Sequence, residues 1–154
     1  MNKIFESVKY ELLISLASVI CFYNSLENDL VHDDIFAIKN NKDIQMDTPL
    51  WKMFRNDFWG RSLVDPKSHK SYRPLCILTF RLNNMIFGMD PFWFHFFNLF
   101  LHVLVCNKLL YILQTSIDMD KKAAFFSALV FATHPVHVEA VSLKLQYLNF
   151  FKYI

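Results

Sequence analysis

Residues 92–113 constrain this chain more than any other feature of its sequence, because they form an apolar segment in which Lys108 is the single charged side chain. A membrane-spanning helix needs about 20 predominantly apolar residues. His95, Asn98 and His102 interrupt the segment, and the last two are four residues apart, so they share one face of a helix. Polar groups in lipid need partners on neighbouring helices. The segment therefore predicts a transmembrane helix whose polar face packs against other helices.

The composition agrees with a helical membrane protein. Hydrophobic residues make up 54% of the 154 residues, and the chain has two glycines and five prolines, which leaves little turn chemistry for a compact β fold. The formal net charge is +2 without a block of basic residues, so the sequence predicts no nucleic-acid partner. The three cysteines are an odd number, and two of them lie in apolar runs. They indicate neither a disulfide framework nor a metal site.

Two further apolar runs lie at residues 12–22 and 123–133. The first is long enough for a signal-peptide core or a short anchor, and the lack of an A-x-A-like site after it favours an uncleaved anchor. Between the runs, "TPLWKMFRNDFW" and "PLCILTFRLNNMIF" predict helices that begin at Pro49 and Pro74. These helices either lie in the membrane interface or pack as a soluble hairpin, and the sequence does not decide between the two.

The expected organisation has four parts. Residues 1–26 form an anchor helix, and residues 27–91 form a large loop with interfacial helices. Residues 92–141 supply two further transmembrane helices and the "HPVHVE" segment, and residues 142–154 form a divergent tail. With three crossings, residues 27–91 and 134–139 lie on one side of the membrane, and residues 1–11 and 116–122 lie on the other. A continuous helix to Glu139 would cover roughly 25 Å from Lys122.

Asp33 and Asp34 are adjacent carboxylates just beyond the first apolar run. Such a pair near a lipid surface is suited to general-base chemistry on a hydroxyl, with one carboxylate accepting the proton and the other orienting it. The alternative is a solvated helix cap, which is the commoner use of an Asp-Asp pair after an apolar run. The spacing alone leaves both interpretations open.

The expected topology brings a second group of polar residues to the same membrane face: His134, His137 and Glu139. Pro135 disfavours a helix at His134, so these residues fit a hydrogen-bonding role better than a metal site. Arg73 precedes a proline and is a candidate phosphate contact, with an ion pair in a loop as the alternative.

Five segments together resemble, in order, the start of the transmembrane and tetratricopeptide-repeat (TMTC) proteins: "VHDDIFAIKNNKD", "TPLWKMFRNDFWG", "SHKSYRPLCILTFRLN", "FHFFNLFLH" and "LVFATHPVHVEAV". The resemblance covers residues 30–141. It implies the N-terminal part of an all-α, multi-pass GT-C type glycosyltransferase of the endoplasmic reticulum membrane, with about three transmembrane helices and one large lumenal loop. It further implies transfer of mannose from dolichyl-phosphate mannose to Ser/Thr hydroxyls of proteins such as cadherin-type domains, without a cofactor.

By this resemblance Asp33 and Asp34 are the catalytic pair, and one of them takes the proton of the acceptor hydroxyl. Contacts of the donor phosphate with Arg73 and with the 134–139 segment are our own inference. Residues 142–154 depart from the family's Gly-Arg-Ala-acidic continuation, and no 34-residue repeat is present. The sequence thus predicts a fragment. The alternative is a non-catalytic truncated membrane protein or subunit, in which the acidic pair and "HPVHVE" serve only folding and capping.

Overall fold

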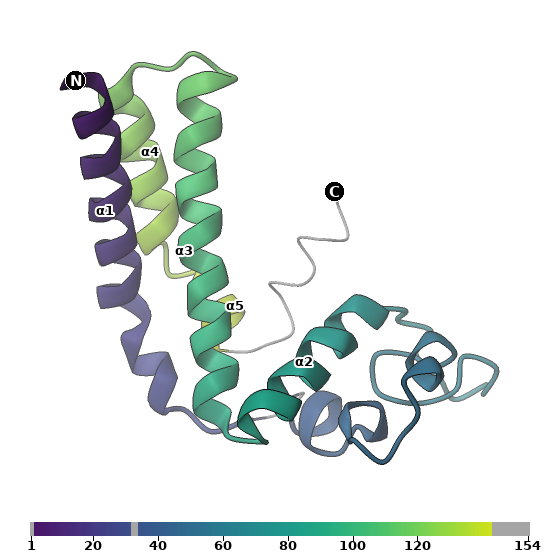
Figure 1. The fold of residues 1–154 in the computed structure, drawn as a ribbon. Coiled ribbons are helices and arrows are strands. Elements are labelled where there is room, and N and C mark those ends of the chain that lie inside the picture. Colours follow the sequence, from purple (N-terminus) through teal and green to yellow (C-terminus); the bar gives the residue numbers. More distant parts are fainter. Residues whose placement is uncertain (1, 32–33, 143–154) are drawn as a thin grey trace.

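The computed structural model describes residues 2–31 and 34–142, and these residues form helices and loops without a β strand. The helices α1 (Asn2–Phe22), α3 (Pro91–Thr115) and α4 (Lys121–Thr133) pack side by side into a bundle (Figure 1). A second body, which we call the foot, extends sideways from the end of the bundle where α1 ends and α3 begins. The all-α prediction is therefore confirmed for the described residues.

The helix α3 forms where the sequence predicts the longest apolar helix. It has 25 residues and begins at Pro91, with the Asp90 carboxylate accepting a hydrogen bond from the backbone N–H of Phe92. Among the described residues, it is the one helix long and apolar enough to cross a membrane. The helix α4 has 13 residues, about 20 Å of rise, and is shorter than the ~30 Å hydrocarbon core.

The third apolar run forms the helix α4, and the "HPVHVE" segment after it opens a separate short helix. The helix α4 ends at Thr133, His134 takes an extended conformation (φ −67°, ψ 130°), and the short helix α5 (His137–Ser142) follows. This break at Pro135 was predicted. Both α4 and α5 pack against α3, so the chain follows α3 in two pieces (Figure 1).

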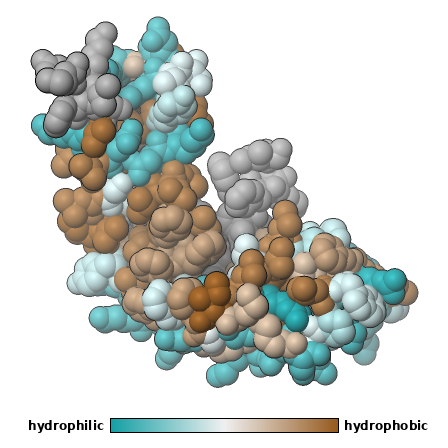
Figure 2. All heavy atoms as spheres, in the orientation of Figure 1, coloured by the Kyte–Doolittle hydropathy of each residue, from teal (hydrophilic) through white to brown (hydrophobic). Residues whose placement is uncertain are grey.

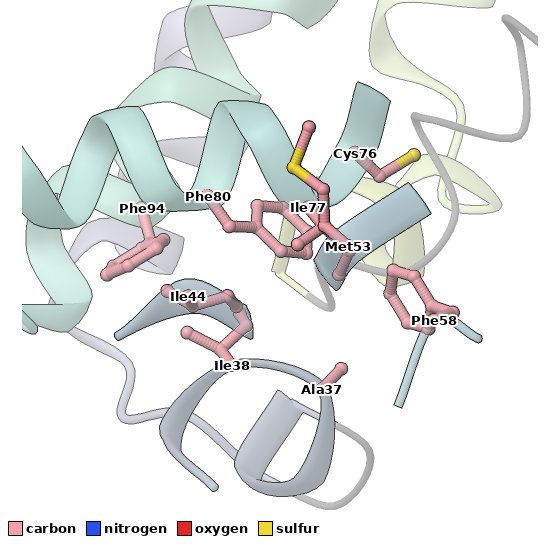
Figure 3. Close-up of a cluster of buried hydrophobic side chains, with 9 residues drawn as sticks. All are labelled: Ala37, Ile38, Ile44, Met53, Phe58, Cys76, Ile77, Phe80 and Phe94. Carbon is pink, nitrogen blue, oxygen red and sulfur yellow. The ribbon is translucent and has the colours of Figure 1, made fainter. Parts of the chain in front are cut away.

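The foot consists of residues 34–87. It contains a π-helix, η2 (Ile35–Lys39), two short 3₁₀-helices, η3 (Lys42–Ile44) and η4 (Leu50–Phe54), and the α-helix α2 (Pro74–Phe87). Figure 3 shows its apolar core, to which α3 contributes one side chain. The core residues are Ala37, Ile38, Ile44, Met53, Phe58, Cys76, Ile77, Phe80 and Phe94. Phe94 belongs to α3, and its burial in this core fixes the foot to the bundle.

The helix α2 begins at Pro74, as the sequence predicts, and it is amphipathic. Its buried Arg81 donates hydrogen bonds to the carbonyls of Asp43 (3.1 Å) and Thr48 (2.6 Å), and its Asn84 donates to the carbonyl of Ile44 (3.1 Å). These bonds hold α2 on the loops of the foot. Its other face exposes apolar side chains, which are Leu75, Leu82, Met85, Ile86 and Phe87.

The helix predicted from Pro49 is much shorter than its pattern suggests. Pro49 precedes a five-residue 3₁₀-helix, η4, in place of opening an α-helix. The reason is that the chain turns back after it: the backbone N–H of Leu63 donates to the carbonyl of Arg55 (3.0 Å), and Asn56 forms an isolated antiparallel bridge with Ser62. The helix-like spacing of apolar residues in this segment therefore belongs to a short 3₁₀-helix and a tight loop.

Candidate functional site

Asp34 lies at the start of the foot and directly precedes the π-helix η2. Its residue is 1% exposed, and its side chain makes no capping hydrogen bond to η2. Asp33, the other member of the acidic pair, lies outside the described residues. Asp34 is therefore buried, and its side chain does not cap η2, unlike the solvated helix cap that the sequence left open as the alternative. The π-helix is itself notable, because such turns occur frequently at functional sites.

A second carboxylate, Asp57, joins two of the sequence motifs. Its Oδ1 accepts hydrogen bonds from the backbone N–H groups of Trp59 (3.0 Å) and Arg61 (2.9 Å), and its Oδ2 accepts one from the Ser68 hydroxyl. Burial raises the pKa of Asp57, but the hydrogen bonds from Ser68 and from the backbone outweigh burial and hold the pKa below its ordinary value. The "NDFWG" and "SHKSYRPL" segments thus form one loop around an ionised carboxylate.

Asn41 connects this loop to the π-helix. Its Nδ2 donates to the carbonyls of Ala37 (3.1 Å) and Phe58 (3.0 Å), and its Oδ1 accepts from the backbone N–H of Asp43 (2.9 Å). Gly60 passes so close that a Cβ there would lie 2.4 Å from Asn41 Oδ1, and its φ is +78°. Glycine is therefore required at position 60 both for space and for backbone conformation.

A pocket of about 590 Å³, open to solvent, lies between the π-helix and this loop. It is lined by Phe36, Asn40, Asp57, Trp59, Arg61 and His69. The ring centroids of Trp59 and His69 are 6.2 Å apart. The pocket shares the π-helix with Asp34. Sequence reasoning missed these lining residues as a site, although three of them belong to the two motifs just described.

Arg73 lies in the foot. It directly precedes α2, at the end of that helix away from α3 (Figure 1), and its guanidinium lies over the Phe58 ring at 5.2 Å from the centroid. This cation–π contact holds Arg73 beside the loop that Asp57 organises. The structure thus places Arg73 close to the foot core.

The histidines of "HPVHVE" lie along the bundle. His102 of α3 is fully buried, and its Nε2 donates to the carbonyl of Ala132 at 3.0 Å, at the end of α4. The ring centroids of His102 and His137 are 5.3 Å apart, and those of His137 and His134 are 6.3 Å apart. Glu139 belongs to α5, but its side chain lies outside the described residues. The break in the third run thus stands opposite the middle of α3.

The polar face predicted for α3 does contact other helices. Besides the His102 bond, Asn98 Nδ2 donates to the carbonyl of Val141 in α5 (3.4 Å), and Asn107 Nδ2 donates to the Ser15 hydroxyl in α1 (2.8 Å). The structure therefore groups the predicted site residues in two places. Asp34 and Arg73 lie in the foot, whereas His134 and His137 lie beside α3.

Several known proteins with similar sequences bear one family name. The chain is 51% identical to the protein O-mannosyl-transferase TMTC1 of Mus musculus over 131 residues, which are 84% of this chain and 14% of that protein. It is 41% identical to Tmtc3 of Drosophila melanogaster over 150 residues (85% and 16%) and 43% identical to TMTC2 of Homo sapiens over 136 residues (86% and 16%).

The chain spans about a seventh of the length of these curated relatives, between 14% and 16%. No family model matches the sequence, and no solved structure matches it. The identities nevertheless far exceed chance over most of the chain, and they confirm the relationship that its motifs predict. Over the matched part of its length, this chain belongs to the family of the TMTC protein O-mannosyl-transferases.

Proposed function

We propose that this chain supplies the acidic pair and the adjoining loop of a protein O-mannosyl-transferase. The reaction transfers mannose from dolichyl-phosphate mannose to Ser/Thr hydroxyls of proteins, such as cadherin-type domains, in the lumen of the endoplasmic reticulum. The names of the relatives support the reaction class. Within the structure, one observation carries the proposal: Asp34 is a buried carboxylate at the start of a π-helix.

The surface supports a membrane location for the bundle. Figure 2 shows hydrophobic side chains over the bundle and along the edge of the foot nearest it, and hydrophilic ones at the far end of the bundle and along the opposite edge of the foot. Exposed apolar residues of the bundle include Leu12, Leu16, Ile20, Phe96, Phe100, Leu104, Phe126 and Val130. In this proposal α1, α3 and the α4–α5 pair cross the membrane as part of a GT-C type fold.

The foot is then the large lumenal loop, and α2 lies in the membrane interface. Its exposed apolar face suits the boundary between headgroups and acyl chains, while its buried face packs on the foot core. In this proposal the foot, which joins the bundle where α1 ends and α3 begins, faces the lumen. Asp34, at the start of the foot, would then lie near the depth of a lipid-linked phosphate.

The chemistry assigns different tasks to the two groups of residues. The acceptor oxygen forms a bond to C1 of mannose while the bond from C1 to the phosphate oxygen breaks. Asp33 or Asp34 takes the hydroxyl proton, and dolichyl phosphate leaves with the bonding electrons. General-base assistance of this kind contributes about 10²–10⁴-fold. Arg73 would contact the phosphate from the foot, and the segment with His134, His137 and Glu139 would contact the lipid-linked donor from the side of α3.

A chimera tests this function, because the chain spans a fraction of its relatives. Residues 1–141 replace the homologous segment of mouse TMTC1, and mannose transfer from dolichyl-phosphate mannose to a cadherin-type acceptor is measured in membranes. Asp33→Asn combined with Asp34→Asn should lower turnover at least about 100-fold at equal expression. The matched control is Asp47→Asn, an exposed carboxylate of the foot, which should retain turnover. Undiminished transfer by the double variant would refute the proposal.

A further inference from the structure

The pocket between the π-helix and the Asp57 loop combines aromatic faces with polar groups. Phe36 comes from η2 and is 61% exposed, while Trp59 packs partly against the foot core. Asn40, Arg61 and His69 complete the rim with hydrogen-bonding side chains. At about 590 Å³ the pocket falls within the roughly 300–1,000 Å³ typical of small-molecule sites.

The walls of this pocket are fixed before any ligand arrives. Asp57 holds the backbone at Trp59 and Arg61, and Asn41 ties the π-helix to the carbonyl of Phe58. The backbone N–H of Phe58 also donates to the carbonyl of Ser71 at 2.7 Å, which closes the loop. Because the backbone that carries the lining side chains is already fixed, a ligand loses little free energy in ordering the main chain of this loop.

The side chains favour a neutral, hydroxyl-rich ligand over an anion. The Arg61 guanidinium donates to the carbonyl of Lys67 (2.9 Å) and lies 3.9 Å from the Asp65 carboxylate, and the ionised Asp57 is part of the same wall. The pocket therefore carries charges of both signs, and an anion would meet Asp57 as well as Arg61. A pyranose ring has a C–H face that stacks on an aromatic ring and a rim of hydroxyls that bond to amide, imidazole and guanidinium groups.

We propose that this pocket binds a hexopyranose, with its ring against Phe36 and Trp59 and its hydroxyls toward Asn40 and His69. The choice of mannose as the sugar rests on the proposed function. The same ring chemistry can come from two sources: the mannosyl phosphate of the donor, or a mannose already attached to an acceptor. The pocket adjoins the segment that begins with Asp34, so either source brings a sugar to the acidic pair.

Binding is measured on the 154-residue chain in detergent micelles by saturation-transfer NMR with methyl α-mannopyranoside. We expect transfer to the sugar ring, and we expect Phe36→Ala and His69→Ala each to weaken binding about tenfold through lost stacking and hydrogen bonding. Both side chains are largely exposed, so neither change disturbs the core. Trp51→Ala, which removes an exposed tryptophan of η4, is the matched control and should leave binding unchanged.

Three results would overturn the inference: no transfer to the sugar, equal binding by Phe36→Ala and wild type, or displacement of the sugar by millimolar inorganic phosphate. Mannose 1-phosphate and an O-mannosyl threonine peptide distinguish the two sources, because the tighter ligand identifies the donor or the acceptor side. The outcome is independent of turnover. The chimera with both aspartates changed should lose mannose transfer and keep sugar binding, whereas Phe36→Ala should weaken binding whether or not transfer occurs.

Discussion

Replacing Asp57 by Asn should loosen the loop of residues 56–71 while leaving the bundle intact. The wild-type carboxylate accepts three hydrogen bonds, from the backbone N–H groups of Trp59 and Arg61 and from the Ser68 hydroxyl. Asn keeps one acceptor oxygen for the two backbone groups. Its amide N–H₂ faces the Ser68 hydroxyl, which already accepts from the backbone N–H of Lys70 at 3.1 Å and then loses the acceptor for its own proton.

The magnitude follows from the loss of charge. A hydrogen bond to an ionised group contributes about 1.5–3 kcal/mol, against about 0.5–1.5 kcal/mol between neutral groups. At about 1–1.5 kcal/mol per bond, making three bonds neutral costs the loop about 3–4.5 kcal/mol. Since about 1.4 kcal/mol corresponds to a factor of ten in an equilibrium constant, amide protons protected by this loop should exchange roughly 140- to 1,600-fold faster.

The assay is hydrogen–deuterium exchange of the chain in detergent micelles, read by mass spectrometry. The reporter is the amide of Phe58, which is bonded to the carbonyl of Ser71, and amides of α3 serve as the internal reference. Asp65→Asn is the matched control: this carboxylate belongs to the same loop but is partly exposed, it accepts one backbone hydrogen bond, from Lys67 (2.8 Å), and its 3.9 Å contact with Arg61 is worth at most about 1 kcal/mol. Its effect should therefore be smaller than that of Asp57→Asn. Exchange within threefold of wild type in Asp57→Asn, or an equal effect of Asp65→Asn, would refute the reasoning.

Three further expectations concern pH, one glycine and one buried histidine. Because the pKa of Asp57 lies below its ordinary value, the carboxylate stabilises the loop fully above about pH 4, and this stabilisation is lost as the pH falls through the lower pKa of the folded state. Hydrogen exchange of the loop, corrected for its intrinsic rate, should therefore rise only at that low pH. Asp57→Asn should remove this rise. Gly60→Ala should destabilise the loop more than Gly88→Ala destabilises its turn, as measured by exchange, because both have φ above +70° but only position 60 lacks space for a Cβ. His102→Ala should expose the neighbouring thiol of Cys106 to maleimide in micelles, and labelling no faster than in wild type would contradict the inference that His102 shields this thiol.

The helices were predictable because their signals are local. The apolar length of α3, the proline at the start of α2 and the break at Pro135 each depend on a few adjacent residues, and all three are confirmed. The shared face of Asn98 and His102 follows from helical spacing alone, and the structure confirms that both bond to other helices.

The hydrogen-bond network of the foot was not predictable, because its bonds join residues that are far apart in the sequence and lie in irregular segments. Asp57 is one of fourteen acidic residues by composition, and nothing in its neighbours announces Ser68 as its partner, eleven positions later. Asn41 reaches Phe58 across seventeen positions. Periodicity carries no information about such contacts. The specific "NDFWG" and "SHKSYRPL" segments were the one available signal, and they marked the right residues without indicating that the two segments meet.

The break after the third apolar run depends on the polar residues of α3, because they supply hydrogen bonds to the backbone at the break. Pro135 has no N–H to donate to the carbonyl of Phe131, and a broken helix leaves further carbonyls without helical partners. The backbone N–H of His134 reaches the carbonyl of Phe131 (3.3 Å), and His102 donates to the carbonyl of Ala132. In lipid each unsatisfied carbonyl would cost several kcal/mol, so a break is tolerable only where a neighbouring helix presents donors. His102 in the middle of α3 therefore satisfies one carbonyl at the point where α4 ends and the chain continues into α5.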